Sequence, residues 1–157
     1  MRHKSFAILS IAAALVATSA HAAATKIADP VVFVRSVYAT TVGRHPEPDD
    51  IYTPRLDALF KLEQKEAGDG VGRLDFDFWM NGQDGTITGA AISKIDVEEA
   101  AGRVIVVAKF KNEKTPNEIH FYFEKIGGGW KLDDVRSVMN DPWVLSLILK
   151  YGWDGKP

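Results

Sequence analysis

The segment "EIHFYFEKIGGGWKLDDV" (residues 118–135) decides the fold. Apolar residues occupy every second position in its first half, which is the pattern of a half-buried strand. The apolar side holds Ile119, Phe121 and Phe123, and the polar side holds Glu118, His120, Tyr122 and Glu124. Because glycine adopts positive φ without steric cost, the glycines at 127–129 predict a tight turn into a second strand at 130–135. The segment therefore predicts a β-hairpin.

Two segments before this hairpin show the same period of two. They are "TITGAAISKIDV" (86–97) and "RVIVVAKF" (103–110), and "EEAAG" and "NEKTPN" look like the turns that connect them to their neighbours. Consecutive strands joined by short turns pair as an antiparallel meander. Val104, Val106 and Phe110 share one face, so we expect helices to cover that face and water to reach the other.

Three dipeptides combine a capping side chain with proline and predict helix starts. They are Asp29-Pro30, Thr53-Pro54 and Asp141-Pro142. The Asp or Thr oxygen accepts a free N–H of the first turn, and proline lacks the N–H that would be unbonded there. We expect the three helices to end near Gly43, Gly68 and Gly152. The predicted fold class is α+β: N-terminal helices packed on a curved antiparallel sheet, with a C-terminal helix.

Residues 1–22 have the features of a signal peptide. Arg2 and Lys4 precede an apolar run, and Ala20 and Ala22 give the A-x-A pattern that signal peptidase recognises. The run is short for a membrane span, and small residues rather than charges follow it. We expect cleavage after Ala22, or one or two residues later, followed by release into the periplasm without membrane attachment. Residues 23–157 then form a single domain.

The charge of the mature chain narrows the classes of partner. The chain has 19 Lys and Arg residues and 21 Asp and Glu residues, and loss of the signal peptide leaves 17 against 21, a net charge of −4. This balance argues against binding to nucleic acid, which requires a basic surface. There is no cysteine, and only two of the four histidines lie beyond residue 22. With no zinc motif, we expect no metal and no other cofactor.

The segment "LDFDFWMNGQDG" (74–85) has the densest group of polar side chains. Asp75, Asp77 and Asn81 match three ligand positions of a calcium-binding loop. Such a loop also needs a further ligand, a glycine and a closing acid, where this chain has Trp79, Met80 and Thr86. The favoured interpretation is a short half-buried edge strand, "LDFDF", followed by the turn residues "NGQDG".

Several of these segments together resemble the DUF3828 family of exported bacterial proteins. They are "FVRSVYAT", "LDALFKLEQ", "LDFDFWMNGQDG" and "FYFEKIGGGWKLDDV", and the resemblance covers about residues 30–150. It implies an NTF2-like or cystatin-like cone, in which the helices and the concave side of the sheet enclose a pocket. Family members carry a tryptophan after Gln-Asp, where this chain has Gly85, so Trp79 is the candidate to supply that aromatic contact.

The resemblance implies a fold rather than an activity. On such a cone the residues Asp77, Trp79, Asn81, Gln83 and Asp84 form either a recognition patch or a hydrogen-bonded structural corner, and the corner is favoured. No catalytic set is evident. We therefore expect a non-catalytic binding module for an unknown protein or small-molecule ligand, with partner binding or immunity-type inhibition as a narrower version. The alternative is a small NTF2-like isomerase or dehydratase, with Asp77 or Asp84 in an apolar pocket facing a Tyr or His donor.

The remaining candidates have a plainer interpretation beside the functional one. His120 suits a general base at neutral pH, although a solvated surface position is favoured. The tryptophans suit a sugar or peptide platform, or else core and hairpin packing; they are Trp130, Trp143 and Trp153. Asp133 and Asp134 have no evident partner in the sequence.

Overall fold

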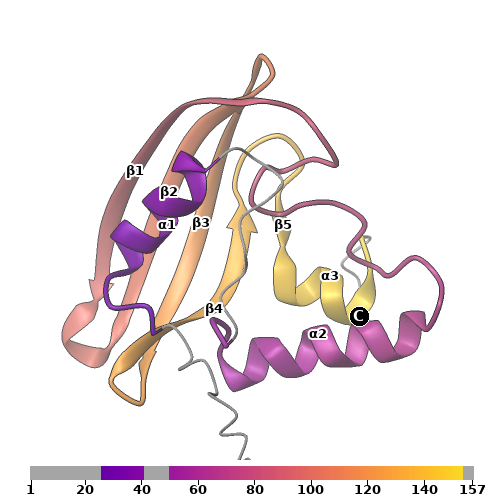
Figure 1. Cartoon of the computed structure of the whole chain (residues 1–157), viewed down its shortest axis with the longest axis horizontal. Coiled ribbons are helices and arrows are strands. Elements are labelled where there is room, and N and C mark those ends of the chain that lie inside the picture. Colours follow the sequence, from indigo (N-terminus) through magenta and orange to yellow (C-terminus); the bar gives the residue numbers. More distant parts are fainter. Residues whose placement is uncertain (1–25, 41–49, 154–157) are drawn as a thin grey trace, which may run out of the picture.

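The computed structural model describes residues 26–40 and 50–153. The expected signal peptide lies outside the described residues. The first helix ends at Ala39, before the expected end near Gly43, because the backbone of Thr40 is extended. Within them the fold is α+β, as predicted, with three α-helices and one five-stranded antiparallel sheet (Figure 1). None of the helices in this part of the chain is both long and apolar enough to cross a membrane.

The sheet is a meander in which each strand pairs with the next one along the chain. Its strands are β1 (Ile87–Glu98), β2 (Arg103–Asn112), β3 (Thr115–Ile126), β4 (Gly129–Ser137) and β5 (Trp143–Val144), and the 3-10 helix η1 (Glu99–Ala101) joins β1 to β2. Four of the five predicted strands are confirmed, with ends that differ by a few residues. The short strand β5 was not predicted.

The β3–β4 hairpin has the predicted geometry. Ile126 pairs with Gly129, so Gly127 and Gly128 form a two-residue turn, and their φ values are 59° and 78°. Positive φ at both positions is typical of a type I′ turn, whose twist matches that of the strands. The apolar side of β3 is buried as expected, with Phe121 at 0% exposure. The hairpin therefore sets which face of the sheet becomes the core.

The opposite face is less solvated than the sequence predicted. Glu118, expected to be exposed, is half-buried, because His120 Nε2 lies 2.8 Å and Lys109 Nζ 3.0 Å from its carboxylate oxygens. The hydrogen bond with His120, followed by that with Lys109, lowers the pKa of Glu118. Glu124, also expected to be exposed, is half-buried beside Arg103. The cross-strand pairs of this face shield side chains that the alternation pattern alone assigns to water.

Two of the three predicted helix caps are confirmed. In α1 (Pro30–Ala39), Asp29 accepts the N–H groups of Val31 and Val32 at 2.7 and 3.1 Å. In α2 (Pro54–Ala67), the Thr53 hydroxyl accepts the N–H of Leu56, and Gly68 follows with a φ of 56°.

The third predicted cap is wrong. α3 (Leu145–Tyr151) begins at Leu145 rather than Pro142, because Trp143 and Val144 first pair with β4 as β5. Asp141 has a φ of 63°, which is far from the extended backbone of a capping residue. The cap of α3 comes instead from Asp134, as described below.

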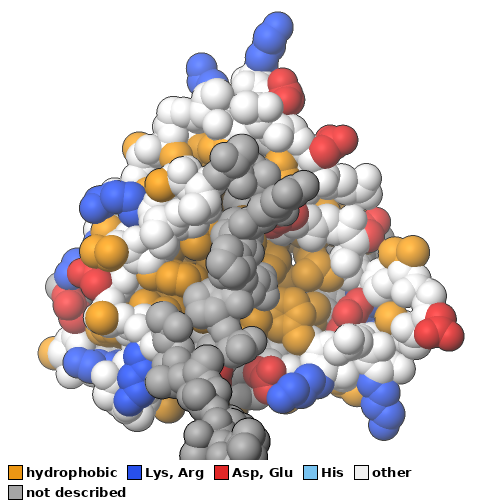
Figure 2. All heavy atoms as spheres, in the orientation of Figure 1, with side chains coloured by type: hydrophobic (Ala, Val, Ile, Leu, Met, Phe, Trp, Pro, Cys, Tyr) orange, Lys and Arg blue, Asp and Glu red, His pale blue; other side chains and the backbone are white. Residues whose placement is uncertain are grey.

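The helices lie against different parts of the sheet. α1 contacts β1 and β2, and its ring of Phe33 meets Phe123 of β3 with centroids 6.3 Å apart. α2 contacts α3 and β4 at the other side of the molecule (Figure 1). Figure 2 shows the molecule from the same side as Figure 1, with hydrophobic side chains gathered near the middle and charged side chains around the rim.

Candidate functional site

Residues 74–85 form a closed loop between α2 and β1, and the predicted edge strand "LDFDF" is absent from it. Asp77 N donates to the Gly82 carbonyl at 2.9 Å, and Gly82 N donates back to the Asp77 carbonyl at 3.3 Å. Residues 78–81 form the turn between them. Phe78, Trp79 and Met80 are all buried in succession, so the loop enters the core at its tip. Alternation of apolar and acidic residues therefore arose here without sheet pairing.

Asp77 and Trp79 belong to the interior of this loop. The Asp77 carboxylate accepts the N–H of Trp79 at 2.8 Å, which is the Asx-turn arrangement. The Trp79 ring stacks on Phe121 with centroids 4.8 Å apart and an interplanar angle of 20°. Tyr38 of α1 donates its hydroxyl to the Trp79 carbonyl at 2.6 Å. Burial, and secondarily the nearby charge of Asp77, hold the pKa of Tyr38 well above 10.0.

Asn81 connects the loop to strands β3 and β5. Its φ is 53°, a left-handed conformation that asparagine tolerates. Its Oδ1 accepts the indole N–H of Trp143 at 2.7 Å, and its Nδ2 donates to Asn117 Oδ1 at 2.7 Å. Both partners are buried. Neither contact could be predicted from a local sequence pattern, because Trp143 and Asn117 are 62 and 36 residues away along the chain.

Gln83 and Asp84 lie on the exposed part of the loop. The Gln83 amide donates to the Asp75 carbonyl at 3.3 Å. At Asp84 it is the main-chain carbonyl, not the carboxylate, that accepts from Asn112 Nδ2 at 3.2 Å. A Cβ added to Gly85, whose φ is 132°, would lie 2.0 Å from Asn112 Oδ1. Asn112 thus occupies the space that a side chain at position 85 would need.

The outer side of the loop lines a pocket of about 480 Å³ together with the C-terminal end of the described chain. Its walls include Asp75, Phe76, Asn81, Gln83 and Trp153. The Phe76 ring meets Trp153 with centroids 5.3 Å apart at 90°, and it meets Trp143 at 5.2 Å. Trp143 is buried, whereas Trp153 is 55% exposed. Of the three tryptophans singled out from the sequence, Trp153 alone is both exposed and part of this pocket.

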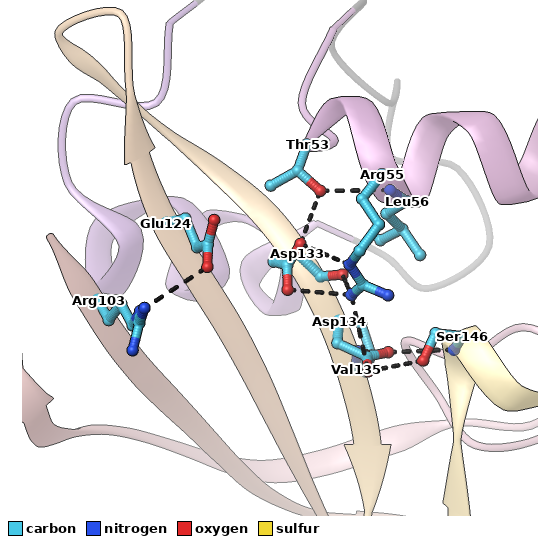
Figure 3. A network of polar contacts seen from close by, with 9 residues as sticks. All are labelled: Thr53, Arg55, Leu56, Arg103, Glu124, Asp133, Asp134, Val135 and Ser146. Carbon is cyan, nitrogen blue, oxygen red and sulfur yellow. Dashed lines mark hydrogen bonds and ion pairs between the residues drawn. The ribbon is translucent and has the colours of Figure 1, made fainter.

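Asp133 and Asp134, for which the sequence offered no partner, form a second polar cluster with a structural role (Figure 3). The Asp133 carboxylate accepts from Thr53 at 2.8 Å and from two nitrogens of Arg55 at 3.0 and 3.1 Å. This hydrogen-bonded pair raises the pKa of Arg55. The Asp134 carboxylate accepts from Ser146 instead. The two adjacent aspartates therefore attach the first turns of α2 and α3 to β4.

Among the described residues 26–40 and 50–153, no group of His, Asp and Glu side chains is arranged to hold a metal ion. The loop pocket is a place where candidate residues from the sequence, an exposed aromatic ring and a cavity coincide. Comparison of the chain with protein-family models, with curated proteins and with solved structures gave no match.

Proposed function

We propose that this chain is an exported, non-catalytic binding module that holds a small molecule, or a group of a partner protein, in the pocket beside residues 74–85. The observation that carries the proposal is the division of the loop into two sides. On the inner side, Asp77 and Trp79 make contacts within the protein. On the outer side, Gln83 lines a pocket together with Trp153. A volume of about 480 Å³ falls in the range of about 300–1,000 Å³ that is usual for small-molecule sites.

The environments of the two carboxylates support binding rather than isomerase or dehydratase chemistry. Asp84 is exposed, and a carboxylate needs an apolar environment to act as a general acid near neutral pH. Asp77 accepts the N–H of Trp79, and the nearby Tyr38 hydroxyl donates to a main-chain carbonyl. The Asp77 carboxylate and the Tyr38 hydroxyl therefore both form hydrogen bonds with the main chain of Trp79, which is a structural role.

The proposal includes an NTF2-like or cystatin-like cone of the DUF3828 kind, with the N-terminal helices on a curved sheet. This part of the proposal is supported by the antiparallel meander and by the contact between the aromatic rings of Phe33 in α1 and Phe123 in β3. It also includes cleavage after Ala22 and a periplasmic location, for which the support is the sequence of residues 1–22. N-terminal sequencing of the protein from a periplasmic fraction tests this part: a start near Ala23 is expected, and an intact Met1 would contradict it.

Capture from periplasmic extract tests the binding function. The wild-type protein, Gln83→Ala and Trp153→Ala are immobilised in equal amounts, with Glu98→Gln as the control. Glu98 is exposed and lies at the end of β1 that is farther along the chain from the loop. Because Gln83 and Trp153 are exposed, both variants should melt like the wild type. Loss of a captured small molecule or protein in these two variants alone supports the proposal, and unchanged capture in both would overturn it.

A further inference from the structure

We propose that the pocket beside residues 74–85 selects an organic cation, specifically an alkylammonium group. This inference rests on the binding function proposed above and adds the chemical class of the ligand. Three features of the pocket carry it: an aromatic corner, free hydrogen-bond acceptors, and a carboxylate without a cationic partner.

The aromatic corner consists of Phe76 and Trp153. Their ring planes are perpendicular, at 90°, and both residues line the pocket. A ligand in the angle between two perpendicular rings can contact both of them, as in the aromatic cages that recognise methylated ammonium groups. The electron-rich face of tryptophan attracts a cation more strongly than that of tyrosine or phenylalanine. Trp153 is 55% exposed, so a ligand can reach it without displacing another part of the described chain.

Two polar side chains of the pocket, Asp75 and Gln83, have free acceptor oxygens. The Gln83 amide nitrogen donates one of its two N–H groups to the Asp75 carbonyl, and its oxygen Oε1 is free to accept from a ligand. The Asp75 side chain is exposed, and within residues 26–40 and 50–153 its carboxylate has no ion pair or hydrogen bond. Asn81 already uses both ends of its amide, with Trp143 and Asn117. A ligand that brings donors or positive charge fits this set.

Among the described residues, the pocket wall has one cationic side chain, Arg73, and one anionic side chain, Asp75, and only the cation already has an ionic partner. The Arg73 guanidinium forms an ion pair with Glu66 and donates to the Leu149 carbonyl at 3.1 Å, so its charge is already matched. Glu63 lies directly behind Gly72, where an added Cβ would be 1.9 Å from Glu63 Oε1. The partners of that oxygen are the main-chain N–H groups of Arg73 and Leu74. The carboxylates of Asp75 and Glu63 therefore lack a cationic side chain, and a bound ammonium group would supply the missing charge.

The test is a calorimetric titration of the mature protein with three probes. Choline represents a free alkylammonium compound, and Nα-acetyllysine amide represents the lysine side chain of a partner protein. The compound 3,3-dimethyl-1-butanol has the shape of choline without its charge. Each probe is titrated into the wild type, Asp75→Asn, Trp153→Ala and the control Glu98→Gln. The indole N–H signal of Trp153 in NMR spectra, identified by its absence in Trp153→Phe, reports where the probe binds.

We expect an ammonium probe to bind and to shift the Trp153 signal, and the uncharged isostere to bind about tenfold more weakly or not at all. The affinity for the ammonium probe should fall by about threefold to tenfold in Trp153→Ala and by about threefold in Asp75→Asn. Glu98→Gln should leave this affinity unchanged. Preference for choline or for the lysine probe then distinguishes a free ligand from a protein side chain.

Equal binding of choline and its isostere would overturn the inference, and so would failure of both ammonium probes. If the ammonium probes fail but capture from extract still depends on Gln83 and Trp153, the binding function stands and only the ligand class is wrong. If capture is also independent of Gln83 and Trp153, both proposals fall.

Discussion

Asp134 of β4 holds the first turn of α3 through Ser146. Its Oδ1 accepts the main-chain N–H of Ser146 at 3.1 Å, and its Oδ2 accepts the Ser146 hydroxyl at 2.8 Å. The residue at the capping position of α3, Val144, has no side chain that can serve as a cap. The helix therefore takes its cap from the neighbouring strand, and Asp134 is only 6% exposed.

Replacing Asp134 should destabilise the protein considerably. Asp134→Ala removes the cap and leaves N–H groups of Val135 and Ser146 without their acceptor, so we expect the unfolding free energy to fall by about 2 kcal/mol. Ser146→Ala loses a single hydroxyl contact and should cost about 1 kcal/mol. Urea denaturation measures both. Equal stability of Asp134→Ala and the wild type would refute the capping role.

Tyr38 should make the protein sensitive to alkaline pH. Its pKa in the folded state is raised above 10.0, chiefly by burial, so the unfolded state loses this proton first as the pH rises. The stabilisation that comes from this difference in the pKa of Tyr38 is fully present below about pH 10, and it is lost as the pH rises toward the folded-state pKa. We expect the unfolding free energy to decrease above about pH 10, and to decrease less steeply in Tyr38→Phe. Denaturant titrations of both proteins at several alkaline pH values test this, and parallel curves would contradict it.

Tyr38→Phe should also lower stability at neutral pH. The substitution removes the hydroxyl that donates to the Trp79 carbonyl at 2.6 Å, and the expected cost is about 1 kcal/mol. Tyr122→Phe is a matched control, because Tyr122 is half-buried on the opposite face of the sheet. If Tyr38→Phe has the same denaturation midpoint as the wild type, the hydrogen bond to Trp79 adds nothing to stability.

Asp77 and Asp84 should differ in their effects although both belong to one loop. Asp77→Ala removes the acceptor of the Trp79 N–H and should cost about 1 kcal/mol or more. Asp84→Ala should stay within about 0.5 kcal/mol, because the Asp84 contact to Asn112 uses the main chain. Asp75→Ala is the control for an exposed carboxylate on the same loop. Thermal melting of the three variants decides the matter, and equal losses for Asp77→Ala and Asp84→Ala would go against it.

Chelation should leave the protein unchanged. Asp75, Asp77 and Asn81 match only part of a calcium loop, so EDTA is expected to leave the melting temperature as it is. A lowered melting temperature that calcium restores would contradict this expectation.

The sequence predicted the elements whose causes are local. The β3–β4 hairpin depends on adjacent glycines, and the caps of α1 and α2 depend on Asp29 and Thr53 beside their own helices. The start of α3 was missed because its cap, Asp134, is in another element. The Asp141-Pro142 dipeptide carries the same local signal as the other two, but pairing of Trp143 and Val144 with β4 overrides it.

The sequence singled out the segment 74–85 but could not predict how its residues are arranged. The segment 74–85 does line a pocket, yet the division between its inward and outward residues follows from the Asp77–Gly82 bridge. A period of two cannot distinguish a strand from a closed loop of this length. The loop is completed by hydrogen bonds to residues of distant strands, namely Asn112, Asn117 and Trp143. No short-range sequence pattern predicts these contacts.

The close approach of Gly85 to Asn112 has an evolutionary consequence. Because the Asn112 amide fills the space next to Gly85, the two positions share one volume and are expected to change together among relatives. A relative with a large side chain at the position of Gly85, such as a tryptophan after Gln-Asp, should carry a small residue at the position of Asn112. Its loop would then be fixed by an aromatic ring in place of the two amide hydrogen bonds that Asn112 donates to the carbonyls of Met80 and Asp84.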